Sequence, residues 1–390
     1  PGPSTHGRGG QLSISPGVSF GLMWVGFGAY LAVLAGAPRL GRHVVWGTIL
    51  LAVGAFTLAP VLLSHDVYSY LDYARLGVVH GLDPYVHPPL AARADPVFRD
   101  VFWRETTSAY GPLFTLATYP LAWLPVGVAI AALKAVAALS VLGLALVVSR
   151  LAAWRGADPL RAAAFVALNP LVLVHVVGGA HNDGLTMLLA MLAVAAVLSA
   201  REISGGAALA AAAATKTSAL FLAPFALLAT AKPRPTGRSP TKSVGFRPVG
   251  RLLAGAALAA AVIGGGAYLA FGWNWLSAVG LAAENQGATS HLSIPSTVAR
   301  LTGLDLDAVR LLALVLFLTL FFELLLWTWH GFDWVRAAGW AAAGLLLATA
   351  WLLPWYLVWL LPLAAVARDR ALQILALALT AYQLGARIPL

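Results

Sequence analysis

Long apolar runs separated by short polar segments extend through nearly the whole chain. The first run covers about residues 19–37 and the second about residues 44–63. A helix needs ~20 apolar residues to cross a bilayer, and about ten to twelve hydrophobic segments follow one another here. The pattern predicts an all-α polytopic integral membrane protein with a single transmembrane domain over residues 19–390. Residues 1–18 are rich in Gly, Pro and Ser, and we expect a disordered tail there.

Composition supports this interpretation. Of the 390 residues, 60% are hydrophobic and 10% are charged, whereas a soluble domain carries about 25% charged residues. The net charge of +10 would suit a nucleic-acid-binding protein, but the basic residues lie mainly in short loops between apolar runs. Because that is the pattern of cytoplasmic loops in membrane proteins, we expect no nucleic-acid partner. The chain contains no cysteine, which excludes disulfides and a cysteine nucleophile.

The distribution of charge predicts which loops face the cytoplasm. Arg39 and Arg42 place the first turn inside. The segment 231–251 is strongly basic and has no acidic residue, so it is the clearest cytoplasmic loop. Counting crossings from these points puts two polar loops outside: a first external loop at residues 65–110, which we expect to be catalytic, and a second at residues 272–307.

Two apolar segments differ from simple membrane spans. Residues 111–124 form a short apolar run, so we expect a re-entrant or partial helix there. Residues 205–230 are interrupted in the middle by Thr215-Lys216-Thr217. A lysine at that depth is costly unless it faces a cavity or an anion, and we expect two half-helices that meet near the outer face.

Four polar clusters converge on the outer face if this topology is right. They are His65-Asp66, Tyr110-Gly111-Pro112, His181-Asn182-Asp183, and Glu284-Asn285 with His291. Such a gathering suits a catalytic cleft, an ion-coupled transport site or a solvated rim. Asp66 differs from the others because it lies within one helical turn of the membrane boundary, beside Tyr68 and Tyr70. Burial at that boundary would raise the pKa of its carboxyl group and suit it to act as a base.

The motifs at these clusters resemble those of the polyprenol-phosphomannose-dependent α-1,6-mannosyltransferases of the actinobacterial cell envelope, a lipomannan-type family of GT-C glycosyltransferases. The resemblance covers roughly residues 63–362. Its motifs are, in chain order, HDVYSYLDYARLGVVHGLDPYVHPP, DPVFRD, YGPLF, NPLVLVHVVGGAHNDGLTMLLA, HLSIPST and LPWYLVWLLP. The resemblance implies a multi-pass GT-C bundle in the plasma membrane, whose external loops form an active site that faces outside the cytoplasm.

The resemblance also implies a reaction. The donor would be polyprenyl-phosphate mannose, the acceptor a mannan or glycolipid, and membrane lipids the surrounding partners. Because a β-linked donor gives an α-linked product, the reaction inverts the anomeric centre and needs a base, and Asp66 matches the family's loop aspartate. The leaving phosphate needs a neighbouring cation or hydrogen-bond donor to stabilise its charge, and the candidates are Lys216, Arg75 and His181. The residues expected to bind substrate are His65, Tyr68, Arg75, Tyr110, His181, Asn182, Asp183, Lys216, Glu284, Asn285 and His291.

No metal or other cofactor is expected. His181 and Asp183 with Asp66 would offer nitrogen and oxygen ligands. The family's donor, however, is not a nucleotide sugar, so there is no diphosphate that a metal ion must neutralise.

Two other functions stay open at this point. In a lipid-linked sugar flippase or secondary transporter, Asp66, Asp183 and Glu323 would be ion-coupling sites. Such a transporter should concentrate its ionisable residues near the bilayer midplane, whereas this chain has nearly all of them in loops. A GT-C transferase for another sugar would differ only in the sugar that it transfers.

Overall fold

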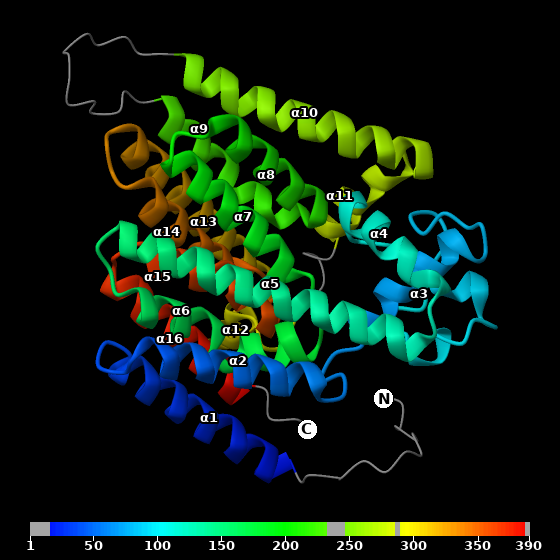
Figure 1. Cartoon of the computed structure of the whole chain (residues 1–390), viewed down its shortest axis with the longest axis horizontal. Helices are drawn as coiled ribbons and strands as arrows, with labels where there is room; N and C mark the ends of the chain where they lie inside the picture. Colours follow the sequence, from blue (N-terminus) through cyan, green and yellow to red (C-terminus); the bar gives the residue numbers. More distant parts are fainter. Residues whose placement is uncertain (1–15, 232–245, 285–288, 387–390) are drawn as a thin grey trace.

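The computed structural model describes residues 16–231, 246–284 and 289–386, and every regular element within these ranges is a helix (Figure 1). The α-helices are α1 (Pro16–Gly36), α2 (Arg42–Leu58), α3 (Asp66–Val78), α4 (Pro112–Thr118), α5 (Val126–Trp154), α6 (Pro159–Ala167), α7 (Asp183–Leu198), α8 (Glu202–Thr215), α9 (Ala223–Ala231), α10 (Phe246–Phe271), α11 (Ser277–Glu284), α12 (Ile294–Thr302), α13 (Leu306–Trp329), α14 (Trp334–Ala348), α15 (Leu361–Val366) and α16 (Arg370–Ala386). The 3-10 helices are η1 (Pro89–Ala92), η2 (Phe98–Asp100), η3 (Tyr119–Trp123), η5 (Thr217–Leu222), η6 (Asn274–Leu276) and η7 (Pro354–Trp359), and η4 (Val172–Gly178) is a π-helix. The all-helical class is confirmed.

Three helices in the described part of the chain are long and apolar enough to cross a membrane by themselves. They lie in α5, α10 and α13, over Val126–Trp154, Arg247–Phe271 and Leu306–Trp329. α6 and η4 would make a fourth span together, but they bend by 64° at the break between them. Only 11% of the apolar window of α13 and 17% of that of α10 are buried inside the protein. Because apolar surface of that extent needs lipid around it, the fold is that of a helical membrane protein.

The first polar loop and two of the basic turns lie at opposite ends of the bundle (Figure 1). α3, α4 and the segment between them lie on the right of the view, whereas the turns from α1 to α2 and from α5 to α6 lie on the left. The first of these turns carries Arg39 and leads to Arg42 at the start of α2, and the second carries Arg155. The two kinds of loop are therefore separated along the bundle as their charge predicted.

The connection from α2 to α3 brings the chain to the polar end. The sequence predicted a span over about residues 44–63, but residues 59–65 are not helical. Lys134 on α5 fastens this connection, because its ammonium group donates to the carbonyl oxygens of Ala59 and Pro60. These carbonyls follow the end of α2, where a cation also interacts favourably with the helix dipole.

Two predicted segment boundaries are corrected by the helices. α1 already begins at Pro16, within the expected tail 1–18, and α10 begins at Phe246, within the expected loop 231–251. The remainders of these two segments, residues 1–15 and 232–245, lie outside the described residues. Helix α10 extends past the apolar run, and Arg251 in its second turn pairs with the buried Glu202 at 3.2 Å.

The two irregular apolar segments differ from each other. α4 has 7 residues and passes directly into η3, which has 5, and the two together reach about 20 Å, which is too short to cross the ~30 Å bilayer core. Residues 111–124 therefore form a partial helix. The predicted break at Lys216 is confirmed, because α8 ends at Thr215, Lys216 is extended with φ −155° and ψ 124°, and η5 follows.

Gly111 joins these two segments at the polar end. Its N–H donates to the carbonyl oxygen of Thr215 at 3.1 Å. A Cβ at this position would overlap the carbonyl oxygen of Ala214, so only glycine allows so close an approach. The start of α4 and the end of α8 are thereby held together beside Lys216.

Candidate active site

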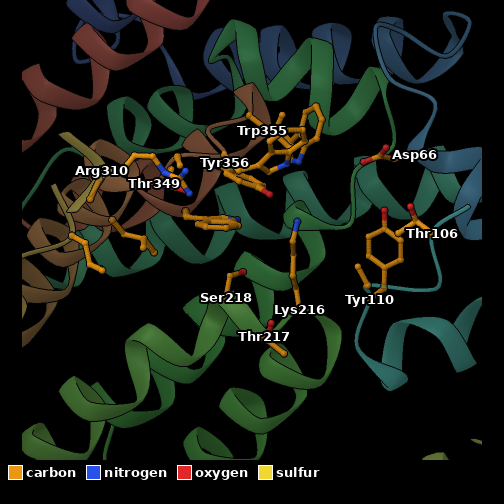
Figure 2. A pocket seen from close by; sticks show the side chains of 18 of the residues that line it. Asp66, Thr106, Tyr110, Lys216, Thr217, Ser218, Arg310, Thr349, Trp355 and Tyr356 are labelled. Atoms are coloured by element: carbon orange, nitrogen blue, oxygen red, sulfur yellow. The ribbon is translucent and has the colours of Figure 1, made fainter. Parts of the chain in front are cut away.

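A cavity of about 770 Å³ lies where the break at Lys216 meets the first polar loop and the C-terminal third of the chain (Figure 2). Its walls include parts of residues 103–110, residues 216–218, helices α13 and α14, and the aromatic segment 350–359. In Figure 2, Asp66 and Tyr110 lie at one end, Arg310 and Thr349 at the other, and Lys216 between them. The volume is within the range of about 300–1,000 Å³ that small-ligand sites occupy.

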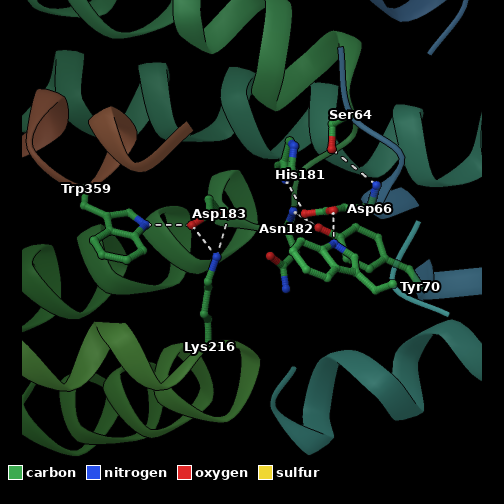
Figure 3. A network of polar contacts seen from close by, with 9 residues as sticks. Ser64, Asp66, Tyr70, His181, Asn182, Asp183, Lys216 and Trp359 are labelled. Atoms are coloured by element: carbon green, nitrogen blue, oxygen red, sulfur yellow. Dashed lines mark hydrogen bonds and ion pairs between the residues drawn. The ribbon is translucent and has the colours of Figure 1, made fainter. Parts of the chain in front are cut away.

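Asp66 is held by three contacts. Its own N–H donates to Ser64 Oγ at 3.2 Å, Trp103 Nε1 donates to its Oδ1 at 3.0 Å, and its Oδ2 lies 3.5 Å from His181 Nδ1 (Figure 3). The side chain is 15% exposed and lines the cavity. Burial raises the pKa of Asp66 above its usual value, although the Trp103 hydrogen bond and the charge of Lys216 oppose that rise. A carboxylate with a raised pKa at a cavity wall suits proton abstraction from a bound hydroxyl group.

His181 contacts Asp66 from a buried position behind the cavity-lining residues. Its ring stacks on Trp355 with 3.7 Å between ring centroids and 19° between planes, and it is 1% exposed. The turn that carries it follows η4, the π-helix, whose irregular hydrogen bonding is often found near functional sites. His181 therefore contacts the expected base, and it does not line the cavity itself.

Lys216 meets the anion that its position in the sequence required. Its Nζ lies 2.8 Å from both carboxylate oxygens of Asp183, which is fully buried at the start of α7 (Figure 3). Trp359 Nε1 donates to the same carboxylate at 2.7 Å. The ammonium group also lies 5.0 Å from the centre of the Tyr356 ring, a distance at which a cation and an aromatic face attract each other. Lys216 lines the cavity and neutralises Asp183 from there.

Asn182 presents a side-chain amide without a partner. It is 4% exposed, and neither its Nδ2 nor its Oδ1 has a hydrogen-bond partner among the described residues. Figure 3 shows it between Lys216 and Asp66. A buried unsatisfied amide is costly, and Asn182 does not itself line the cavity.

Tyr110 completes the polar end of the cavity. Its ring packs edge-on against Tyr70 at 4.7 Å and its carbonyl oxygen accepts a hydrogen bond from Tyr85. It precedes Gly111, so its position depends on the contact between that glycine and Thr215. Asp66, Tyr110 and Lys216 are thus the expected site residues that line the cavity.

Three residues expected near the substrate lie elsewhere in the polar loop. The Nε of Arg75 lies 2.9 Å from the Asp95 carboxylate, and its Nη1 donates to the Ala122 carbonyl. His65 contacts the carbonyl oxygen of Asp100 through Nδ1, and its ring packs on Tyr68 at 5.7 Å. Arg75, His65 and Tyr68 do not line the cavity, and their contacts hold the loop in place instead.

The fourth predicted cluster is not brought to the cavity. Glu284 is exposed at the end of α11, and His291 is exposed with its carbonyl oxygen accepting from Arg300 at 3.1 Å. Asn285 lies outside the described residues. The charge pattern predicted that this loop lies near the outer face, and it held no information about which of its side chains turn inward.

Several cavity residues were not predicted as site residues. They are Trp103, Arg310, Thr349, Trp351, Trp355 and Tyr356. The aromatic run near the C-terminus was visible in the sequence, and its composition suited a membrane interface or a lipid-lined groove. Trp103 and Arg310 had no such signal, because each is a single residue in an unremarkable local pattern.

Among the described residues, no group of three or more His, Asp or Glu side chains is placed to hold a metal ion. Asp66 and His181 do meet, but Asp183 is engaged by Lys216 and Trp359. The expectation that no metal takes part stays a prediction.

Comparison with known proteins identifies the family. Residues 7–232 match the family described as Alpha-(1->6)-mannopyranosyltransferase, N-terminal domain. A protein named Alpha-(1->6)-mannopyranosyltransferase A from Mycobacterium tuberculosis is 30% identical, over 88% of this chain and 70% of its own length. One of the same name from Corynebacterium glutamicum is 27% identical, over 73% of this chain and 62% of its own. The chain therefore belongs to the α-(1→6)-mannopyranosyltransferase family and is a mannosyltransferase, which is a class of glycosyltransferase.

Proposed function

We propose that this protein transfers mannose from a polyprenyl-phosphate donor to a mannan-type glycolipid, with inversion at the anomeric carbon and with Asp66 as general base. The observation that carries the proposal is the composition of the cavity. One end holds a partly desolvated carboxylate, and the α13 wall toward the other end carries Leu311, Leu314 and Phe317 beside Arg310, on a helix that is mostly not buried within the protein. A donor that is a sugar at one end and a hydrocarbon chain at the other suits both surroundings.

The proposed chemistry needs one base and a stabilised leaving group. Asp66 accepts the proton of the acceptor hydroxyl group while that oxygen forms a bond to C1 of mannose. The bond from C1 to the phosphate oxygen breaks on the opposite face, and the electron pair leaves with the lipid phosphate. Hydrogen-bond donors beside the leaving oxygen lower the barrier, and Lys216 is the cation between the two ends of the cavity.

The acceptor sugar would bind at the Asp66 end. Trp103, Tyr73 and Tyr110 line that part of the cavity, and flat aromatic rings with a polar edge suit the faces and hydroxyl groups of sugars. Tyr73 is fixed by donating to the carbonyl oxygen of Thr106 at 2.7 Å. Asn182 does not line the cavity, so its unpartnered amide would reach a hydroxyl group of the donor or acceptor sugar only after its side chain rotates toward the cavity.

The same proposal includes a GT-C type bundle and an active site outside the cytoplasm. Residues 103–110 of the first polar loop line the cavity, and this loop lies at the end of the bundle away from the Arg39 and Arg155 turns (Figure 1). Positively charged short loops stay in the cytoplasm, so the cavity would face the opposite side of the plasma membrane. A mannan acceptor that is assembled outside would then reach Asp66 directly.

Purified protein given radiolabelled polyprenyl-phosphate mannose and an α-1,6-mannooligosaccharide tests the proposal. We expect a longer oligosaccharide whose new residue is released by an α-mannosidase. A β-linked product would contradict the inverting mechanism. Absence of any longer product, together with movement of the labelled lipid across a vesicle membrane, would favour the flippase alternative.

A further inference from the structure

One face of α13 forms a continuous wall of the cavity. Asp307, Arg310, Leu311, Leu314 and Phe317 all line it. Their spacings of three, one, three and three residues put them on the same face of an α-helix. The face therefore begins with two charged residues near the start of the helix and continues with three apolar ones toward its middle.

This wall is also open to the side of the bundle. Leu311 is 62% exposed and Leu314 is 49% exposed although both line the cavity. On a helix whose apolar surface needs lipid, such residues mark a lateral opening into the bilayer. From Arg310 to Phe317 the helix rises about 10 Å, so the polar and apolar parts of the wall lie at different depths.

Arg310 and Lys216 are both cations of the cavity, but their charges are compensated differently. Lys216 pairs through both oxygens with Asp183, which is 0% exposed. Arg310 pairs with Asp307 at 3.1 Å, and Asp307 is 84% exposed. A pair with so exposed a partner is weak because water screens it. The planar guanidinium group of arginine is also suited to bind phosphate through two hydrogen bonds at once.

We infer that Arg310 recognises the phosphate of the lipid donor where the lipid enters sideways, and that Leu311, Leu314 and Phe317 hold its first isoprenoid units. The identity of the lipid rests on the proposed function. Arg310 then contributes to binding of the donor. Lys216, which lies between Arg310 and Asp66, contributes to the chemical step. Figure 2 shows this order, with Arg310 at the far end from Asp66 and Lys216 between them.

The test measures equilibrium binding of polyprenyl phosphate and of the uncharged polyprenol of equal length to the full chain in lipid nanodiscs. We expect the wild type to prefer the phosphate and Arg310→Gln to reduce that preference about 10-fold or more, since a hydrogen bond to a charged group is worth at least a factor of ten. Arg310→Lys should retain part of it. Inorganic phosphate should compete poorly, because it lacks the chain that the apolar wall binds.

Two matched variants separate recognition from structure. Asp307→Asn removes one carboxylate that pairs with Arg310 and keeps the cation, so phosphate binding should stay equal or become tighter. Arg300→Gln removes an exposed arginine that contacts His291 and Thr297 and does not line the cavity, so it should bind like the wild type. In turnover, Arg310→Gln should lower kcat/KM for the donor while kcat changes little.

An unchanged phosphate preference in folded Arg310→Gln would overturn the inference. If that variant does not fold, the wild type and Asp307→Asn decide, because a wild type without preference, or a loss of preference in Asp307→Asn, also contradicts it. Equal competition by inorganic phosphate would assign the site to the free ion and not to the lipid. If polyprenyl phosphate binding depends on Arg310 but the protein transfers no mannose, the proposed function fails and the inference about Arg310 stands.

Discussion

The ammonium group of Lys216 lies 2.8 Å from both carboxylate oxygens of Asp183, which has no exposed surface. One residue follows the end of α8 and the other begins α7, so the pair joins two helices at the floor of the cavity. Removal of one partner from a buried pair leaves an uncompensated charge, which costs more than the pair itself contributes.

We therefore expect Lys216→Met to lower the free energy of unfolding by about 3–5 kcal/mol. The double variant Lys216→Met with Asp183→Asn should recover much of this loss, because no buried charge is then left alone. Thermal unfolding of the purified variants in one detergent measures both effects. A double variant as unstable as the single one would mean that the ion pair is not what stabilises this contact.

Trp103→Phe tests the hydrogen bond to the expected base. The indole N–H favours the charged form of Asp66 and so lowers its pKa against the effect of burial. Without it the pKa of Asp66 should rise further, and the base should lose its proton only at a higher pH. The acid limb of the profile of kcat/KM against pH should shift to higher pH. Activity should fall several-fold at the pH values of that limb and less at high pH.

Trp154→Phe is the matched control for this change. Trp154 ends α5 and is 64% exposed, and it does not line the cavity. Its pH profile should coincide with that of the wild type. A Trp103→Phe profile that is scaled down equally at every pH would show that the indole only shapes the cavity.

Gly111→Ala should disturb the cavity from outside it. The added Cβ would overlap the carbonyl oxygen of Ala214 and push apart α4 and the end of α8, on which Lys216 depends. Forced overlap of this kind costs about 1–3 kcal/mol, and transfer activity should fall with it. Gly127→Ala, where a Cβ meets nothing within 4 Å, should be neutral or slightly stabilising in the same unfolding assay because alanine favours helix.

The orientation of the protein can be tested with single thiols, because the chain has no cysteine. Val86 is 49% exposed in the loop at the cavity end, and Arg39 is exposed in the turn at the other end. In spheroplasts, an impermeant thiol reagent should label Val86→Cys and spare Arg39→Cys until the membrane is opened. The reverse labelling pattern would place the cavity in the cytoplasm.

The sequence predicted those features that follow from the free-energy cost of burying a charged side chain in an apolar membrane segment. A lysine in the middle of an apolar run is costly unless it faces a cavity or an anion, and Lys216 lines the cavity and pairs with Asp183. The sequence could not show that Arg75 would form an ion pair with Asp95, since that pairing depends on how the loop folds back on itself. Nor could it show Arg310 in the cavity, because the face that a mostly lipid-exposed helix turns inward is set by its neighbours and not by its own pattern.

The most direct measurement is the turnover of Asp66→Asn beside the wild type, with polyprenyl-phosphate mannose and an α-1,6-mannooligosaccharide. Asparagine keeps an oxygen to accept the Trp103 hydrogen bond and cannot take the proton of the acceptor, so folding and donor binding should persist. We predict a loss of about 10²–10⁴-fold in kcat, which is the usual contribution of a general base. A folded Asp66→Asn protein that keeps kcat within a few-fold of the wild type would contradict the assignment of Asp66 as the base.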